Sequence, residues 1–190
     1  MKETRVANLN VETRAEGDNA QSLVLVGMPI VFDTPTVIHD PFIGDYNEVI
    51  KRTALDETVL DDTRLLYNHD SNKIPLARTP KTMSLNVAEK GVEMRAVLAN
   101  TATSQEVYTA VERGDLSGMS FAFKVPKGGD SYDRATNTRT ISKIEKIYEV
   151  SVVPFPAYPQ TSVEARSSIQ LVNSEAYEKA RITLNQILKH

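Results

Sequence analysis

Two alternating runs joined by a glycine-containing turn constrain the fold more strongly than any other part of the chain. Apolar residues alternate with polar ones in both runs, first at Met83, Leu85 and Val87 and then at Val92, Met94, Ala96 and Leu98. Residues 89–91 (Glu-Lys-Gly) lie between them. A period of two places the apolar side chains on one face of a strand, and a short connection with glycine is typical of an antiparallel hairpin. The pattern predicts a β-hairpin over residues 81–98.

Other short segments extend this prediction to six to eight strands. We expect them at residues 22–32, bent at Gly27, and at 64–67, 74–78, 119–125 and 138–153, with irregular spacing near Ile144. Residues 33–46 are rich in turn residues and predict a surface loop. A helix should begin with a capping box at Thr103 and Glu106 and end at Gly114. Weaker helix patterns cover residues 53–60 and 175–188.

These elements predict a mainly β (α+β) fold, a small closed or partly open β-barrel with helices packed outside. Residues 1–20 are polar and predict a flexible N-terminal arm or a first edge strand. Residues 21–160 would form the β-barrel domain, and residues 161–190 a serine-rich linker with a C-terminal helix or tail.

Composition excludes several classes of site. The 190 residues include no cysteine, which rules out disulfides, thiolate metal sites and a cysteine nucleophile. The net charge of −3 gives no footprint for nucleic acid, and no basic run indicates binding to a membrane surface. The polar start of the chain predicts no signal peptide, and no apolar run reaches the roughly 20 residues that span a bilayer. We therefore expect an intracellular protein, or one packaged without export.

Three residues are candidates for chemistry. Ser120 lies in a predicted strand, on the face away from Met119 and Phe121, and His69 follows a buried-looking strand. Glu149 lies within a strongly β segment, where an acid must be exposed or paired. A serine hydroxyl needs a base to take its proton, and a histidine base needs a partner to orient it. His69 could be that base and Glu149 that partner.

Each candidate also has an ordinary interpretation. Ser120 could be a strand residue, with Ser117 as its rival, and His69 could be a turn histidine. Arg78 or Lys124 could pair with Glu149 instead. The remaining histidines are His39, in a turn that predicts a surface position, and the terminal His190. One histidine with scattered acids lacks the ligand spacing of a metal site.

Three ordered blocks resemble the prohead protease family of tailed bacteriophages, serine peptidases with a herpesvirus-assemblin-like fold. The first block is Leu65-Leu66-Tyr67-Asn68-His69-Asp70, followed by Pro75-Leu76-Ala77-Arg78-Thr79. The second is Gly114-Asp115-Leu116-Ser117-Gly118-Met119-Ser120-Phe121-Ala122-Phe123, and the third is Glu149-Val150-Ser151-Val152-Val153-Pro154-Phe155-Pro156-Ala157-Tyr158. The likeness covers about residues 20–165. It implies that His69 is the catalytic histidine and Ser120 the nucleophile. The third catalytic position is less settled in the family pattern, and Glu149 is its best match.

The resemblance implies an endopeptidase of prohead maturation that needs no cofactor. Its substrates would be the scaffold protein or the scaffold-like arm of the major capsid protein, and the enzyme itself. It would act in the host cytoplasm, packaged inside the immature capsid, with a homodimer expected by analogy with assemblins. The alternative is a non-catalytic β-barrel module that binds capsid or scaffold protein.

Overall fold

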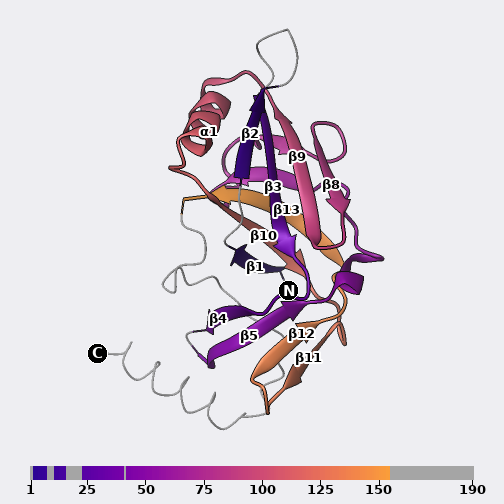
Figure 1. The fold of residues 1–190 in the computed structure, drawn as a ribbon. Helices are drawn as coiled ribbons and strands as arrows, with labels where there is room; N and C mark the ends of the chain where they lie inside the picture. The colour runs from indigo at the N-terminus through magenta and orange to yellow at the C-terminus, as the bar shows by residue number, and fades with distance from the viewer. Residues whose placement is uncertain (1, 8–10, 16–22, 41, 155–190) are drawn as a thin grey trace, which may run out of the picture.

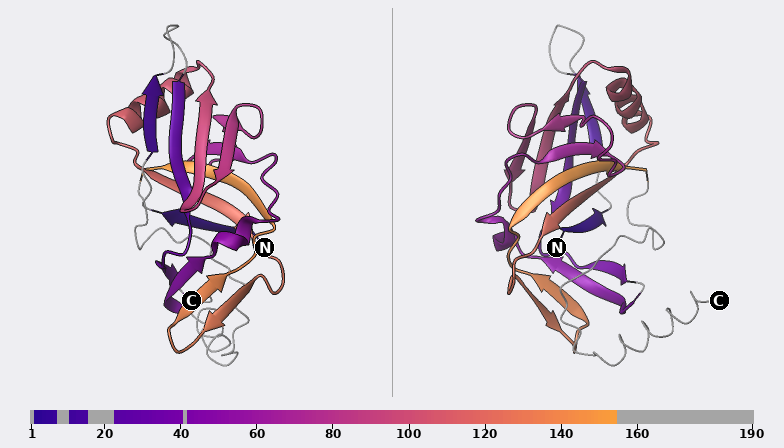
Figure 2. Two further views of the ribbon diagram at one scale, coloured as in Figure 1. Left: turned by 45° about the vertical axis from the view of Figure 1, so that its right-hand side comes forward. Right: turned by 180° about the vertical axis from the view of Figure 1, so that it is seen from behind.

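Three β-sheets make up most of the described structure. The computed structural model describes residues 2–7, 11–15, 23–40 and 42–154. The central sheet has five strands, in the order β1 (Lys2–Ala7), β10 (Gly118–Lys124), β13 (Lys146–Val153), β6 (Arg64–Tyr67) and β7 (Ala77–Arg78). Figures 1 and 2 show this sheet between the other two.

Each of the other two sheets has four strands. One, at the lower end in Figure 1, runs β11 (Asp130–Asp133), β12 (Thr138–Ile141), β5 (Gly44–Ile50) and β4 (Thr36–Asp40). The other, at the upper end, runs β2 (Val11–Ala15), β3 (Leu23–Val31), β9 (Gly91–Leu98) and β8 (Met83–Val87). Among these strands, β12 pairs with β5 and β13 pairs with β6 in parallel, and the other pairings are antiparallel.

The core forms between the central sheet and the β2–β3–β9–β8 sheet. Met119, Phe121 and Phe123 of β10 are buried on one face, as their alternation predicts, and β10 packs against β3. The face that carries Ser120 and Ala122 is therefore the opposite one. The hydrophobic core thus holds β10 rigidly while leaving its second face for polar groups.

One α-helix and one 3₁₀ helix lie within the described residues. Helix α1 (Ala102–Glu112) contacts β2 and β3 (Figure 1), and Gly114 follows it with a φ of 80°. Its predicted start was wrong by two residues, because Thr101 has the extended backbone of an N-cap and accepts a hydrogen bond from the Ser104 N–H. The short helix η1 (Arg52–Leu55) covers only the first residues of the predicted helix over 53–60. No helix in these ranges has both the length and the hydropathy needed to cross a membrane.

Several predicted strands are confirmed. Strands β8 and β9 form the hairpin, and the β3–β9 register shifts between Gly27 and Ile30, where a bend was expected. The segment 138–153 is wrong as a single strand, because β12 and β13 belong to different sheets. Residues 33–46 are wrong as a loop, since β4 and the start of β5 pair there. Turn-forming residues within the segment hid that hairpin.

The mainly β fold is confirmed, but a closed barrel is not formed by the described residues. The three sheets remain open, each with two edge strands. Residues 2–7 and 11–15 are strands, so the edge-strand alternative describes these parts of the arm. The division into 1–20, 21–160 and 161–190 stays a prediction. The predicted helix over 175–188 lies outside the described residues.

Candidate active site

The loop after β6 brings His69 to Glu149 of β13. β13 and β6 are parallel neighbours, with Glu149 opposite Arg64 and Ser151 opposite Leu66. Asn68 and His69 then adopt φ values of 50° and 58°, a left-handed conformation that is uncommon for residues other than glycine. His69 Nδ1 lies 2.7 Å from Glu149 Oε1. This contact holds the imidazole ring and favours the tautomer with its proton on Nδ1.

The second ring nitrogen of His69 has no partner in the described structure. Its Nε2 atom is buried and makes no hydrogen bond, although the side chain as a whole is 30% exposed. With the proton on Nδ1, the Nε2 lone pair is free to accept one. A buried, unpaired acceptor costs free energy, so such a group is a feature of functional sites.

Ser151 joins the two residues into one network. Its hydroxyl donates to Glu149 Oε2 at 2.6 Å and accepts a hydrogen bond from the His69 backbone N–H at 3.3 Å. Both Glu149 and Ser151 are buried. Ser151 was not among the predicted site residues. The signal was present, because the alternation in residues 148–153 places Glu149 and Ser151 on one strand face.

Ser120 lies one strand away from this network. It is directly opposite Ser151 across the antiparallel β10–β13 pair, so the two side chains share a face with Cβ atoms about 5 Å apart. Ser120 is fully buried, and its Oγ donates a hydrogen bond of 2.5 Å to the backbone carbonyl of Arg5 in β1. The described residues contain no hydrogen bond between Ser120 and His69. The structure therefore joins His69 to Glu149 and leaves the Ser120 hydroxyl directed at β1.

The rival pairings suggested by the sequence do not occur. Arg78 pairs with Asp62 at 2.6 Å, and Lys124 pairs with Glu145 at 2.7 Å, so neither neutralises Glu149. Ser117 is an exposed loop residue. His39 is well exposed and pairs with Asp45 at 2.8 Å, as expected for a surface histidine. His190 lies outside the described residues.

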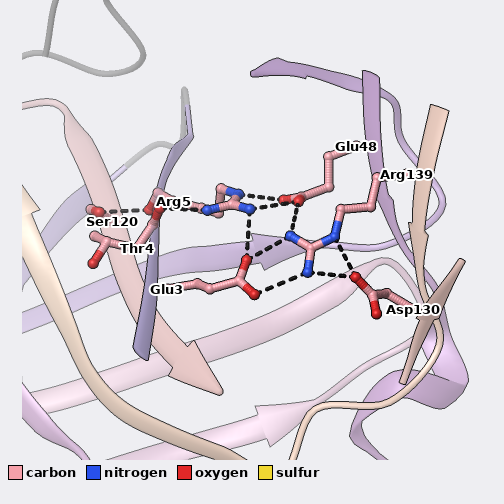
Figure 3. A network of polar contacts seen from close by, with 7 residues as sticks. All are labelled: Glu3, Thr4, Arg5, Glu48, Ser120, Asp130 and Arg139. Atoms are coloured by element: carbon pink, nitrogen blue, oxygen red, sulfur yellow. Dashed lines mark hydrogen bonds and ion pairs between the residues drawn. The ribbon is translucent and has the colours of Figure 1, made fainter. Parts of the chain in front are cut away.

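A buried cluster of charged side chains lies on the face of β1 that points away from Ser120. Arg139 bonds Glu3 at 2.6 and 2.9 Å, Glu48 at 3.0 Å and Asp130 at 2.7 Å, and Arg5 bonds Glu48 at 2.5 and 2.6 Å and Glu3 at 2.8 Å (Figure 3). We call these five residues the charge cluster. No pattern in the sequence indicated it, because its members come from β1, β5, β11 and β12.

The charges of the cluster stabilise one another despite their burial. Burial alone would raise the pKa of Glu3, but its hydrogen bond from Arg139 and the nearby charges of both arginines lower that pKa below 4.5. Burial would likewise lower the pKa of Arg5, but the charge and hydrogen bonds of Glu48 raise it. Burial raises the pKa of the neighbouring Tyr46 to about 12. The Glu3 carboxyl is therefore ionised at neutral pH.

A comparison with known families decides which family the chain represents. The model of the caudovirus prohead serine protease family matches residues 9–175. The chain belongs to this family. The matched range includes His69, Ser120 and Glu149.

Two individual proteins are similar to this member of the prohead serine protease family. The chain is 29% identical over 126 residues to the prohead protease of Enterobacteria phage HK97, covering 64% of this chain and 54% of that protein. It thus spans about half the length of that curated relative. A solved structure of the bacteriophage T4 capsid assembly protease, gp21, aligns with a TM-score of 0.46 at 10% identity, covering 82% of this chain and 99% of that one.

The described residues of this family member do not group three or more histidines, cysteines or acids in a way that could hold a metal ion. What its site does contain is a histidine with a fixed ring, a free Nε2 acceptor and a buried serine on the adjacent strand. These are the components of general-base activation of a hydroxyl.

Proposed function

We propose that this chain is a serine endopeptidase in which Ser120 is the nucleophile, His69 the general base and Glu149 the residue that orients it. The observation that carries the proposal is the His69 Nδ1–Glu149 Oε1 contact of 2.7 Å, which leaves a buried Nε2 unpaired. Membership of a serine protease family supports the same assignment. Ser151 would act as a positioning residue through its bonds to Glu149 and to the His69 backbone.

The proposed reaction follows the usual course of acyl transfer. Ser120 Oγ attacks the carbonyl carbon of a peptide bond while its proton passes to His69 Nε2. The C–N bond then breaks, and the departing amine takes that proton. A water molecule, deprotonated by His69, next hydrolyses the acyl-enzyme and releases the acid. Glu149 stabilises the imidazolium formed in both steps.

We propose that the substrates are the scaffold protein or the scaffold-like arm of the major capsid protein, and the enzyme itself, and that cleavage occurs inside the immature capsid. The name of the HK97 relative, a prohead protease, supports this setting. We also propose a partly open, assemblin-like arrangement of the three sheets. A homodimer stays a prediction by analogy.

Co-expression with the cognate capsid and scaffold proteins tests the function directly. Ser120→Ala should abolish cleavage, since loss of a serine nucleophile costs on the order of 10⁶-fold in turnover. Ser117→Ala is the matched control and should process normally, because Ser117 is an exposed loop residue. His69→Ala should be inactive and His39→Ala active. Intact mass gives the cleavage sites. Normal processing by Ser120→Ala would refute the proposal.

One observation favours the alternative of a non-catalytic capsid- or scaffold-binding module. The Ser120 hydroxyl bonds the Arg5 carbonyl, and no hydrogen bond joins it to His69 in the described structure. That alternative predicts that Ser120→Ala and Ser117→Ala bind capsid or scaffold protein equally and that neither wild type nor variant cleaves it.

A further inference from the structure

Strand β1 places a peptide carbonyl against the proposed nucleophile. β1 is an edge strand of the central sheet and pairs antiparallel with β10, with Val6 opposite Ser120 and Arg5 opposite Phe121. The carbonyl oxygen of Arg5 accepts the Ser120 hydroxyl hydrogen bond at 2.5 Å. An extended peptide bound to a protease by strand addition would present a carbonyl at the same place. The hydroxyl that should face His69 is therefore engaged by the chain's own backbone.

Two side chains of β1, those of Glu3 and Arg5, are held on the face away from Ser120. Glu3 and Arg5 are both buried, and they point to the side of Phe123, whose ring lies 5.5 Å from the Arg5 guanidinium. Arg139 grips the Glu3 carboxylate with two nitrogens, and Glu48 grips the Arg5 guanidinium with two oxygens (Figure 3). Two-point contacts of this kind select planar, oppositely charged partners.

The spacing of the two gripping residues matches that of an extended chain. Glu48 and Arg139 are direct neighbours across the parallel β5–β12 pair, and they are cross-linked at 3.0 Å. Side chains two residues apart on a strand point the same way, as Glu3 and Arg5 do. Arg139 therefore binds an acidic side chain, and Glu48 binds a basic side chain two residues further along the same strand.

We propose that the β10 edge at Ser120, together with Glu48 and Arg139, is the binding site for an extended peptide of the form acid-x-base, and that Glu3–Arg5 is its internal occupant. This inference rests on the proposed function of Ser120. The occupied site is a resting form, because β1 covers the nucleophile and diverts its hydroxyl. A substrate strand with the same charge pattern replaces β1 before cleavage begins.

Removing the anchors of β1 should uncover Ser120. The double variant Glu3→Met/Arg5→Met loses one acid and one base, so the net charge of the cluster is unchanged, and Glu48 keeps its contact with Arg139. A fluorophosphonate reagent, which loses fluoride as Ser120 Oγ bonds to phosphorus, reports the access and activation of the serine. We expect labelling about tenfold or more faster than in wild type, the effect of losing even one strong ion pair. Thr4→Ala, in the same strand, should label like wild type.

Added peptides test the charge pattern in the double variant. The hexapeptide Lys-Glu-Thr-Arg-Val-Ala, which copies β1, should slow the labelling of Ser120 or be cut after its arginine. Its isomer with glutamate and arginine exchanged should do neither at the same concentration. Equal protection by both peptides would overturn the acid-x-base preference.

A disulfide lock keeps the test independent of the folding of the double variant. The chain has no cysteine, and Thr4 is directly opposite Ala122 across β1–β10, so Thr4→Cys/Ala122→Cys adds a single bridge. The oxidised protein should resist labelling, and reduction should restore the wild-type rate. Equal labelling of locked, reduced and wild-type protein would overturn the occupancy of the site while leaving Ser120 as nucleophile. No labelling of Ser120 in any variant would refute the proposed function, and this inference with it.

Discussion

The charge cluster makes a quantitative prediction for Arg139→Met. Arg139 is fully buried and bonds three acids, Glu3, Glu48 and Asp130. Its loss leaves those three acids with Arg5 as the one base of the cluster. Breaking a buried ion pair by removing one partner costs about 3–5 kcal/mol. Because 1 kcal/mol shifts the melting temperature of a domain of this size by about 2–4 °C, we expect a decrease of about 6–20 °C.

A second variant shows whether Arg139→Met loses stability because an acid is left without its base or because the side chain no longer packs as well. Glu3→Met/Arg139→Met removes an acid with its base and leaves the two-point Arg5–Glu48 contact intact. Replacing a buried pair by apolar side chains of similar volume is often neutral or stabilising. The double variant should therefore recover most of the stability that Arg139→Met loses, although Glu3→Met alone leaves Arg139 underpaired and is itself destabilising.

Urea and thermal unfolding at pH 7 and pH 4.5, followed by circular dichroism, measure these differences. The deficit of Arg139→Met should be smaller at the lower pH, because an uncompensated buried acid is relieved when it takes up a proton. A loss below about 1 kcal/mol in Arg139→Met, the ordinary value for an exposed pair, would refute the reasoning. So would a double variant less stable than both single variants.

Three further predictions concern other parts of the structure. Ser151→Ala should lower kcat about 10- to 100-fold with little change in KM, because it removes one hydrogen bond to the charged Glu149; a change confined to KM would contradict a positioning role. Gly91→Ala should destabilise the fold by about 1–3 kcal/mol in urea unfolding, since a Cβ there would lie 2.2 Å from the Ile30 carbonyl oxygen. The pKa of Glu3 is below its ordinary 4.5, so its contribution to stability is present above that pH and is lost as the pH falls through the lowered value. Unfolding free energy measured from pH 6 to pH 3 should drop less steeply in Glu3→Met/Arg5→Met than in wild type.

Local sequence patterns predicted the strands in which large apolar side chains alternate with small or polar ones. The alternation in β8 and β9 reflects burial of one strand face, so it could be read without knowing any partner strand. In β10 both faces are buried, and the alternation separates the large apolar side chains of one face from the small Ser120 and Ala122 of the other. The same alternation placed Ser120 away from Met119 and placed Glu149 with Ser151. Where turn-forming residues lie inside strands, as in β4 and β5, this reasoning failed because the pairing of distant segments overrides local preference.

The amino-acid sequence by itself determined the mainly β class and the candidate residues His69, Ser120 and Glu149. It also determined the family to which the chain belongs. Only the tertiary structure decided that the Glu149 carboxylate contacts the His69 ring. It alone also decided that β1 pairs with β10, so that the Arg5 carbonyl oxygen accepts a hydrogen bond from the Ser120 hydroxyl. Register between strands far apart in the chain depends on which buried faces and charges satisfy one another. No local pattern encodes that choice, so the charge cluster and the occupied edge of β10 emerge only from the folded chain.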